Sequence, residues 1–157
     1  MIALKFTKIL IKDMKATPIE DGKVIPFYSW HVNLYKLNNR KHILFVNDLT
    51  RLCVIIDGVR SSQLKLLQEK FVSTLRTYLC SEGIDQAAID DYLAQAWDIT
   101  VTKTDNRSVL GTMKEISIFA SDGFEDPIER MKWLNRLIFK PIEYQRPIHV
   151  FKDALLN

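Results

Sequence analysis

Residues 30–47 constrain the fold of this chain most, because apolar and polar side chains alternate there with a period of two. Such alternation is typical of β-strands with one buried face. Asn38 and Asn39 tolerate the positive φ angles of a two-residue turn, so the stretch predicts a hairpin with Tyr35 opposite His42. The face expected to be buried holds Trp30, Val32, Leu34, Ile43 and Phe45. The face expected to be open and polar holds His31, Asn33, Tyr35, His42, Leu44 and Val46.

Hydrophobic periodicity and helix-start signals predict the remaining elements. Leu52–Ile56 is apolar on both faces and extends the hairpin to a three-stranded meander. Shorter strands are expected at 2–6 and 99–102, and a short helix from Thr7 to Met14, with a continuous strand over 2–11 as the alternative. Longer helices are expected from Ser61 or Ser62 to Cys80, and after the caps Asp85, Asn106 and Asp126.

These elements together predict one α+β domain spanning residues 1–157. Its sheet would be small and antiparallel, with the meander plus one or two further strands, and about four helices would pack mainly on one face. Trp97 and Trp133 are expected near the core, and Gly111 predicts close packing of its helix on the sheet. Pro141 and Pro147 predict an extended tail through His149.

Composition and charge set limits on the class of protein. Hydrophobic residues make up 47% and charged residues 26% of the chain, which is ordinary globular composition. The net charge of +3 permits a polyanionic partner without requiring one. Residues 83–98 carry acidic side chains and no basic ones, which indicates either a solvated helix face or a contact surface for a basic partner.

Cellular location is predicted from what the sequence lacks. The apolar run at residues 1–6 is too short for a signal peptide, and no run of about 18 apolar residues follows it. Cys53 and Cys80 fit neither a zinc pattern nor a disulfide framework. We therefore expect a cytoplasmic protein that does not contact a membrane.

The first candidate site is the polar face of the hairpin. His31, Asn33 and Tyr35 point the same way from one strand, and His42 joins them from the next. An imidazole, an amide and a phenol can bind a polar ligand or support acid–base chemistry. As metal ligands, two histidines are too few without help from His149 or an acid. No metal and no cofactor are expected. The structural alternative is a hydrogen-bonded, partly exposed sheet face.

The second candidate site is the segment 102–108 at a predicted helix start. Lys103, Arg107 and the hydroxyl of Ser108 lie next to the free backbone N–H groups of the helix, which suits a phosphate or carboxylate. The glycines of a P-loop are absent. In the structural alternative Asn106 is only a helix cap, and Arg107 is a surface base near Asp105.

Two separated motifs carry a family resemblance. Trp-His-Val-Asn-Leu at 30–34 with Asn-Arg-Lys at 39–41, and Asn-Arg-Ser-Val-Leu-Gly at 106–111, are similar to motifs of a bacterial family of small uncharacterised domains. The resemblance covers residues 6–133 and implies no activity, substrate or cofactor. The matching positions are Trp30, Asn33, Asn39, Arg40, Asn106, Arg107, Ser108 and Gly111.

These observations favour a small binding or regulatory module over an enzyme, with nucleic acid or a phosphorylated ligand as its anionic partner. Arg40, Lys41 and Arg107 would supply charge, and the remaining predicted binding residues are Asn33, Tyr35, Asn106 and Ser108.

Two alternatives stay open. The first is a small hydrolase or nuclease with His31 as general base and Arg107 stabilising negative charge, for which Asp48 and Asp105 are the candidate acids. The second is a protein–protein module, of the immunity or antitoxin kind, that uses the acidic pair Asp90 and Asp91.

Overall fold

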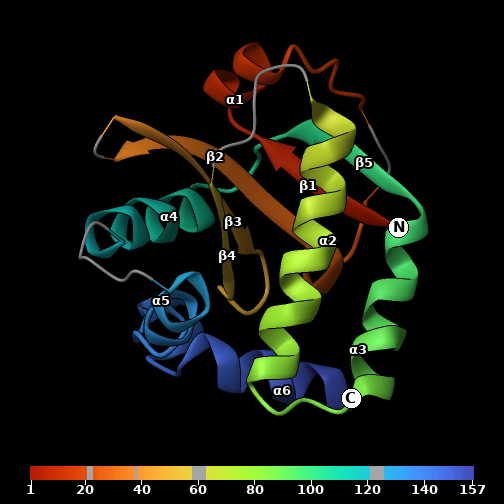
Figure 1. Cartoon of the computed structure of the whole chain (residues 1–157), viewed down its shortest axis with the longest axis vertical. Helices are drawn as coiled ribbons and strands as arrows, with labels where there is room; N and C mark the ends of the chain where they lie inside the picture. Colours follow the sequence, from red (N-terminus) through yellow and green to blue (C-terminus); the bar gives the residue numbers. More distant parts are fainter. Residues whose placement is uncertain (21–22, 38, 58–62, 121–125) are drawn as a thin grey trace.

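The computed structural model describes residues 1–20, 23–37, 39–57, 63–120 and 126–157. Its centre is a five-stranded sheet in the order β4-β3-β2-β1-β5 (Figure 1). The strands are β1 (Ile2–Phe6), β2 (Ser29–Leu37), β3 (Arg40–Asn47), β4 (Cys53–Asp57) and β5 (Ile99–Lys103). The α-helices are α1 (Lys8–Met14), α2 (Leu64–Ser81), α3 (Gln86–Leu93), α4 (Arg107–Phe119), α5 (Pro127–Leu134) and α6 (Pro147–Leu156). Short 3-10 turns are η1 (Pro26–Tyr28), η2 (Ala94–Trp97) and η3 (Lys140–Ile142).

The predicted hairpin is present with the predicted register, because Tyr35 pairs with His42 and both faces hold the expected side chains. Asn39 has a φ of 61°, as a tight turn requires, whereas Asn38 lies outside the described residues. β4 pairs antiparallel with β3 and completes the meander. β1, however, pairs in parallel with both β2 and β5, so the sheet is mixed and not wholly antiparallel.

Helices cover both faces of the sheet, which corrects the prediction of helices mainly on one face. One hydrophobic cluster joins one face of β1–β4 to side chains of α2, α3 and α6. A second cluster joins the opposite face of β3 and β4 to α4 and to Leu134 of α5. The physical reason is that these two strands are apolar on both faces, and each face needs a cover. The described helices number six, against the four long ones and one short one expected.

Three of the predicted helix caps are confirmed, and Asp85 is the exception among the described residues. The side chains of Thr7, Asn106 and Asp126 accept backbone N–H hydrogen bonds at the starts of α1, α4 and α5. Asp85 precedes α3 but makes no side-chain capping bond, and Gln63 precedes α2 likewise. The predicted caps of α2, at positions 61 and 62, lie outside the described residues.

Three further predictions were wrong: they concern the C-terminal tail, two tryptophans and one glycine. The tail is not extended, because α6 begins at Pro147, where a proline suits the first helical turn and its missing N–H costs nothing. Trp97 is 81% exposed and Trp133 40% exposed, so neither is a core residue. Gly111 is exposed on α4, and a Cβ atom there would meet nothing within 4 Å, so close packing does not explain it.

Candidate functional site

The polar face of the hairpin is not open at His31. This residue is fully buried, because α4 packs against β2 and β3 on that side. Its Nδ1 atom lies 2.7 Å from a carboxylate oxygen of Asp48, and its Nε2 atom accepts a hydrogen bond from the backbone N–H of Asp105 at 3.3 Å. The nitrogen that a general base would use is therefore already engaged.

Lys5 of β1 joins the two carboxylates beside His31. Its ammonium group lies 2.9 Å from Asp48 and 3.1 Å from Asp105, and β1 places it directly opposite His31 in the sheet. Lys5, His31, Asp48 and Asp105 are called the polar cluster below. Burial alone would raise the pKa of Asp48, but the hydrogen bond and charge of His31, followed by those of Lys5, outweigh it and lower the pKa. Burial would lower the pKa of Lys5, but both carboxylates together raise it.

The polar cluster has the spacing of a metal site. One ligand atom each from His31, Asp48 and Asp105 lie within 4.8 Å of one another. The ammonium group of Lys5 contacts both carboxylates, which is the place that a cation would take. A metal ion would have to displace this ammonium group, so the residues present fit an internal ion-pair network better than a metal centre.

Arg51 ties the cluster to α4. Its guanidinium group donates to the backbone carbonyl of Asp48, to the hydroxyl of Ser108 at 2.9 Å and to the hydroxyl of Thr112 at 3.2 Å. Sequence reasoning missed both Arg51 and Lys5 as parts of this site. A charged residue within the otherwise apolar strand 2–6 was the available signal for Lys5.

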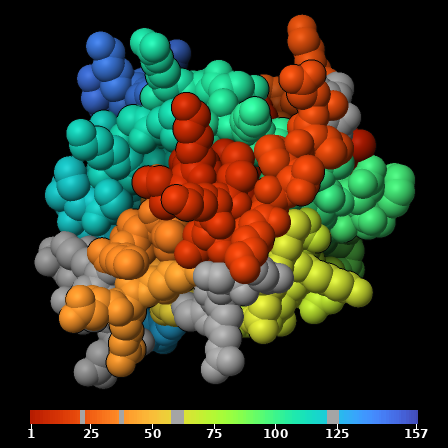
Figure 2. All heavy atoms as spheres, turned by 90° about the horizontal axis from the view of Figure 1, so that it is seen from above, coloured from red at the N-terminus to blue at the C-terminus, as the bar shows by residue number. Residues whose placement is uncertain are grey.

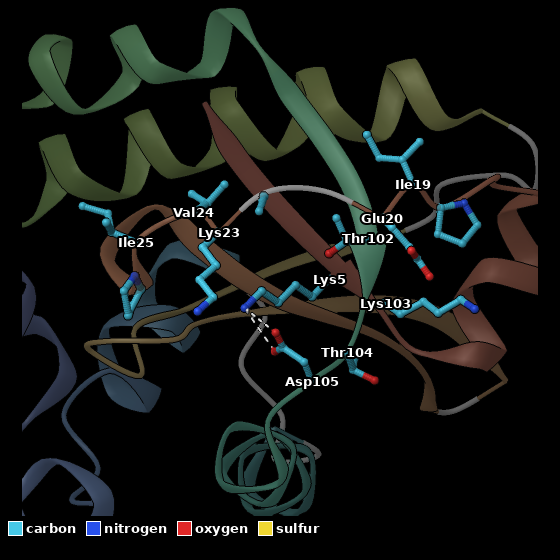
Figure 3. A pocket seen from close by; sticks show the side chains of 13 residues that line it. Lys5, Ile19, Glu20, Lys23, Val24, Ile25, Thr102, Lys103, Thr104 and Asp105 are labelled. Atoms are coloured by element: carbon cyan, nitrogen blue, oxygen red, sulfur yellow. Dashed lines mark hydrogen bonds and ion pairs between the residues drawn. The ribbon is translucent and has the colours of Figure 1, made fainter.

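A cavity of about 910 Å³ lies beside the polar cluster, on the part of the sheet face that α4 leaves uncovered. Figure 3 shows it above β1 and β5, with Lys5 and Asp105 paired at its edge. Three groups of residues line it. The apolar residues are Ala3, Pro18, Ile19, Val24, Ile25 and Pro26, the lysines and threonines are Lys5, Lys23, Lys103, Thr102 and Thr104, and the acids are Glu20 and Asp105.

The other predicted residues of the hairpin face have structural partners. Asn33 accepts a hydrogen bond from the hydroxyl of Thr7 at 2.7 Å, which positions the start of α1. Tyr35 stacks on His42 with ring centroids 5.3 Å apart, and the hydroxyl of Tyr35 is buried without a hydrogen-bond partner. His42 in turn contacts Asp57. These side chains form a second polar group nearer the hairpin tip.

The charged residues of the two candidate sites lie apart. Arg40 and Lys41 begin β3 at the hairpin tip, whereas Arg107 is exposed at the start of α4, next to the polar cluster. Six residues of strand separate His31 from the tip, which corresponds to roughly 20 Å at about 3.3 Å per residue. Asn106 accepts hydrogen bonds from two backbone N–H groups of α4, so it acts as the predicted cap.

Helix α1 lies between these two charged regions. Asp13 of α1 contacts Lys41, and the backbone N–H of Thr104 binds the carbonyl of Phe6, just before α1. Figure 2 shows α1 in red at the centre of one side of the molecule, between the orange hairpin and the green connection from β5 to α4. The exposed bases on these segments are called the basic face. They are Lys8, Lys12, Lys15, Lys36, Arg40, Lys103 and Arg107.

Charge along the chain agrees with this arrangement. Residues 1–47 hold eight Lys and Arg side chains against three Asp and Glu, whereas the remaining residues hold fourteen against sixteen. The positive charge of the protein is therefore concentrated on the segments that build the basic face and the cavity. The acidic pair on α3 is elsewhere in the chain, and Asp90 there binds Arg76 at 2.6 Å.

Fold and site define a mixed α+β domain with an internal ion-pair network beside an open, lysine-lined cavity. The chain belongs to the family described as a domain of unknown function, DUF6933, whose model matches residues 3–150. The expected membership of a family of uncharacterised domains is confirmed, and the match reaches beyond residues 6–133 to include most of the C-terminal segment. Comparisons with curated proteins and with solved structures found no match. Within the described ranges, no helix has both the length and the apolar character needed to cross a bilayer.

Proposed function

We propose that this protein is a nucleic-acid-binding module whose contact surface is the basic face. The observation that carries the proposal is the spread of exposed bases over α1, the hairpin tip and the connection from β5 to α4. A small anion cannot contact Arg40 and Arg107 at once, because about 20 Å of sheet separates their regions. A phosphate backbone has repeating charges that can follow such a strip.

The geometry favours binding over catalysis. His31 is fully buried and both of its ring nitrogens are engaged, so a substrate cannot reach it without rearrangement. Asp48 and Asp105, the candidate acids near His31, are both engaged by Lys5, and Asp48 also by His31. The polar cluster serves this proposal as a rigid support that holds the start of α4, and with it Arg107, in place.

Binding is tested by fluorescence anisotropy with labelled single- and double-stranded RNA and DNA, at low and near-physiological salt. We expect salt-sensitive binding without cleavage, also after magnesium is added. Arg40→Glu and Arg107→Glu should each weaken binding at least about tenfold, which corresponds to about 1.4 kcal/mol. Lys140→Glu is the matched control, since this exposed base on η3 lies outside the basic face.

Three outcomes would contradict the proposal. The first is no binding to any of the four nucleic acids at low salt. The second is an affinity that Arg107→Glu leaves unchanged, which would remove that residue from the contact. The third is cleavage that His31→Ala abolishes, which would favour the hydrolase alternative.

A further inference from the structure

We propose that the cavity above β1 and β5 binds a small phosphate monoester with an apolar or aromatic body, such as a nucleoside monophosphate. The site shares Lys103 with the basic face but differs from it in size and in the residues that matter most. Its volume of about 910 Å³ falls within the range of roughly 300–1,000 Å³ found for small-molecule sites. The proposal therefore does not depend on nucleic-acid binding.

Apolar side chains in the walls of the cavity suit an apolar ligand body. The segments 18–20 and 23–26 contribute Pro18, Ile19, Val24 and Ile25 to the lining. Ile19 is 51% exposed and Ile25 is 60% exposed, although both are large apolar side chains. A flat ligand placed against them would remove this surface from water, which is favourable in proportion to the area covered.

The end of the cavity that holds Lys5 and Lys23 suits one anionic group. In Figure 3 the side chains of Lys5 and Lys23 project toward the same end of the cavity, and the hydroxyl-bearing Thr102 lies beside them on β5. Asp48 and Asp105 both pair with Lys5, so Lys23 supplies the positive charge that remains for a ligand.

Acidic residues limit the charge that the ligand can carry. Glu20 lines the cavity with Lys103, and Figure 3 places both away from the end that holds Lys5 and Lys23. A second phosphate extending in that direction would gain no net charge attraction, because the carboxylate of Glu20 lies there together with the ammonium group of Lys103. Glu20 can instead accept hydrogen bonds from hydroxyl or amino groups of a ligand. This combination favours a monophosphate over a triphosphate.

Isothermal titration calorimetry of the full chain tests the proposal with the four ribonucleoside monophosphates, with adenosine, with ATP and with inorganic phosphate. We expect saturable binding of at least one monophosphate. Adenosine should bind at least about tenfold more weakly than AMP if the phosphate is recognised, and ATP should bind no more tightly than AMP. Inorganic phosphate should bind more weakly than the monophosphates, because it cannot cover the apolar side chains of the lining.

Variants at the edge of the cavity keep the test independent of folding. Lys23→Gln and Ile25→Ser change exposed side chains outside the polar cluster, and each should weaken monophosphate binding about five- to tenfold. Lys140→Gln should bind as the unchanged protein does. Failure of all four monophosphates to bind at millimolar concentration would overturn the proposal, as would equal binding of AMP and adenosine or no effect of Lys23→Gln.

The experiments can contradict either proposal without contradicting the other. Lys23 is outside the basic face, and Arg40 is outside the cavity lining. A protein that binds nucleic acid through Arg40 but ignores monophosphates supports only the first proposal. Monophosphate binding lost in Lys23→Gln, without nucleic-acid binding, supports only the second.

Discussion

Asp48 shows how a single side chain can connect several elements of this fold. It lies in the turn between β3 and β4, and it binds both His31 of β2 and Lys5 of β1. Its carboxylate is largely withdrawn from water, with a side-chain exposure of 7%. A buried carboxylate is tolerated only when partners compensate its lost hydration, and here a ring nitrogen and an ammonium group do so.

The stability of the protein should depend on pH through Asp48. Its pKa in the folded state is below the ordinary value of 3.8, so its stabilising contribution is complete above that value. The contribution is lost as the pH falls through the lowered pKa, because protonation then breaks the ion pairs. Urea unfolding of the unchanged protein and of Asp48→Asn should show a difference in unfolding free energy at about pH 7 that shrinks below about pH 4.

A matched control for this measurement is Asp91→Asn, since Asp91 is exposed on α3. Its unfolding free energy should follow that of the unchanged protein across the pH range. A constant difference between Asp48→Asn and the unchanged protein from pH 7 to pH 3 would contradict the role assigned to the carboxylate.

Gly111→Ala should stabilise the protein. The position lies in the interior of α4, and an added Cβ atom would meet nothing within 4 Å. Alanine is better than glycine in a helix by about 0.5–1 kcal/mol, because glycine loses more conformational freedom on folding. Thermal unfolding should show a higher midpoint for Gly111→Ala, and a lower one would mean that the glycine has a packing role after all.

At the scale of elements, Asn135 closes the outer edge of the sheet. β4 is an edge strand, and exposed edges carry unpaired backbone groups. The side chain of Asn135, just after α5, accepts a hydrogen bond from the N–H of Cys53 at 2.8 Å and donates one to its carbonyl at 3.0 Å. A buried amide thus takes the place of one residue of a neighbouring strand.

Removing this amide should be costly. Asn135→Ala leaves the N–H and the carbonyl of Cys53 buried without partners, at about 1–3 kcal/mol for each unsatisfied group. Denaturant unfolding should therefore show a loss of about 2–6 kcal/mol. Asn135→Asp retains the acceptor and should lose less unless burial of the charge dominates. A loss under about 0.5 kcal/mol in Asn135→Ala would contradict the edge-closing role.

At the scale of the whole molecule, the basic face gives the nucleic-acid proposal a quantitative consequence. Each phosphate neutralised by a Lys or Arg side chain contributes about −0.7 to the slope of log affinity against log salt for a single strand. Lys12 is exposed in the last turn of α1. Lys12→Gln should reduce both the affinity and the steepness of the salt dependence, whereas Lys140→Gln should change neither. An unchanged slope in Lys12→Gln would place α1 outside the contact.

Binding of an anionic partner, a bacterial origin and a cytoplasmic location all stay predictions for this protein. The protein–protein alternative also stays open, because Asp91 is exposed on α3. The carboxylate of Asp90, by contrast, already binds Arg76 within the chain, so a basic partner would have to compete with Arg76 for it.

The sequence by itself determined the local structure of this protein. Alternation at 30–47 set the hairpin register, and Asn106 and Asp126 set two helix starts, because these signals act over a few residues. It also pointed to His31, Asp48 and Asp105 as neighbours in a possible site. Its signal at Pro147 was ambiguous, since a proline can break a helix or begin one.

Only the tertiary structure decided which faces are covered and what the polar residues do. Parallel pairing of β1 with β2 and β5 placed Lys5 opposite His31, which no local pattern expresses because the pairing joins segments distant in sequence. Packing of α4 over β2 turned a polar face that was expected to be open into a buried network. The cavity lies beside this network, over β1 and β5. Long-range contacts, and not residue preferences, decide whether a histidine such as His31 is open to solvent or buried.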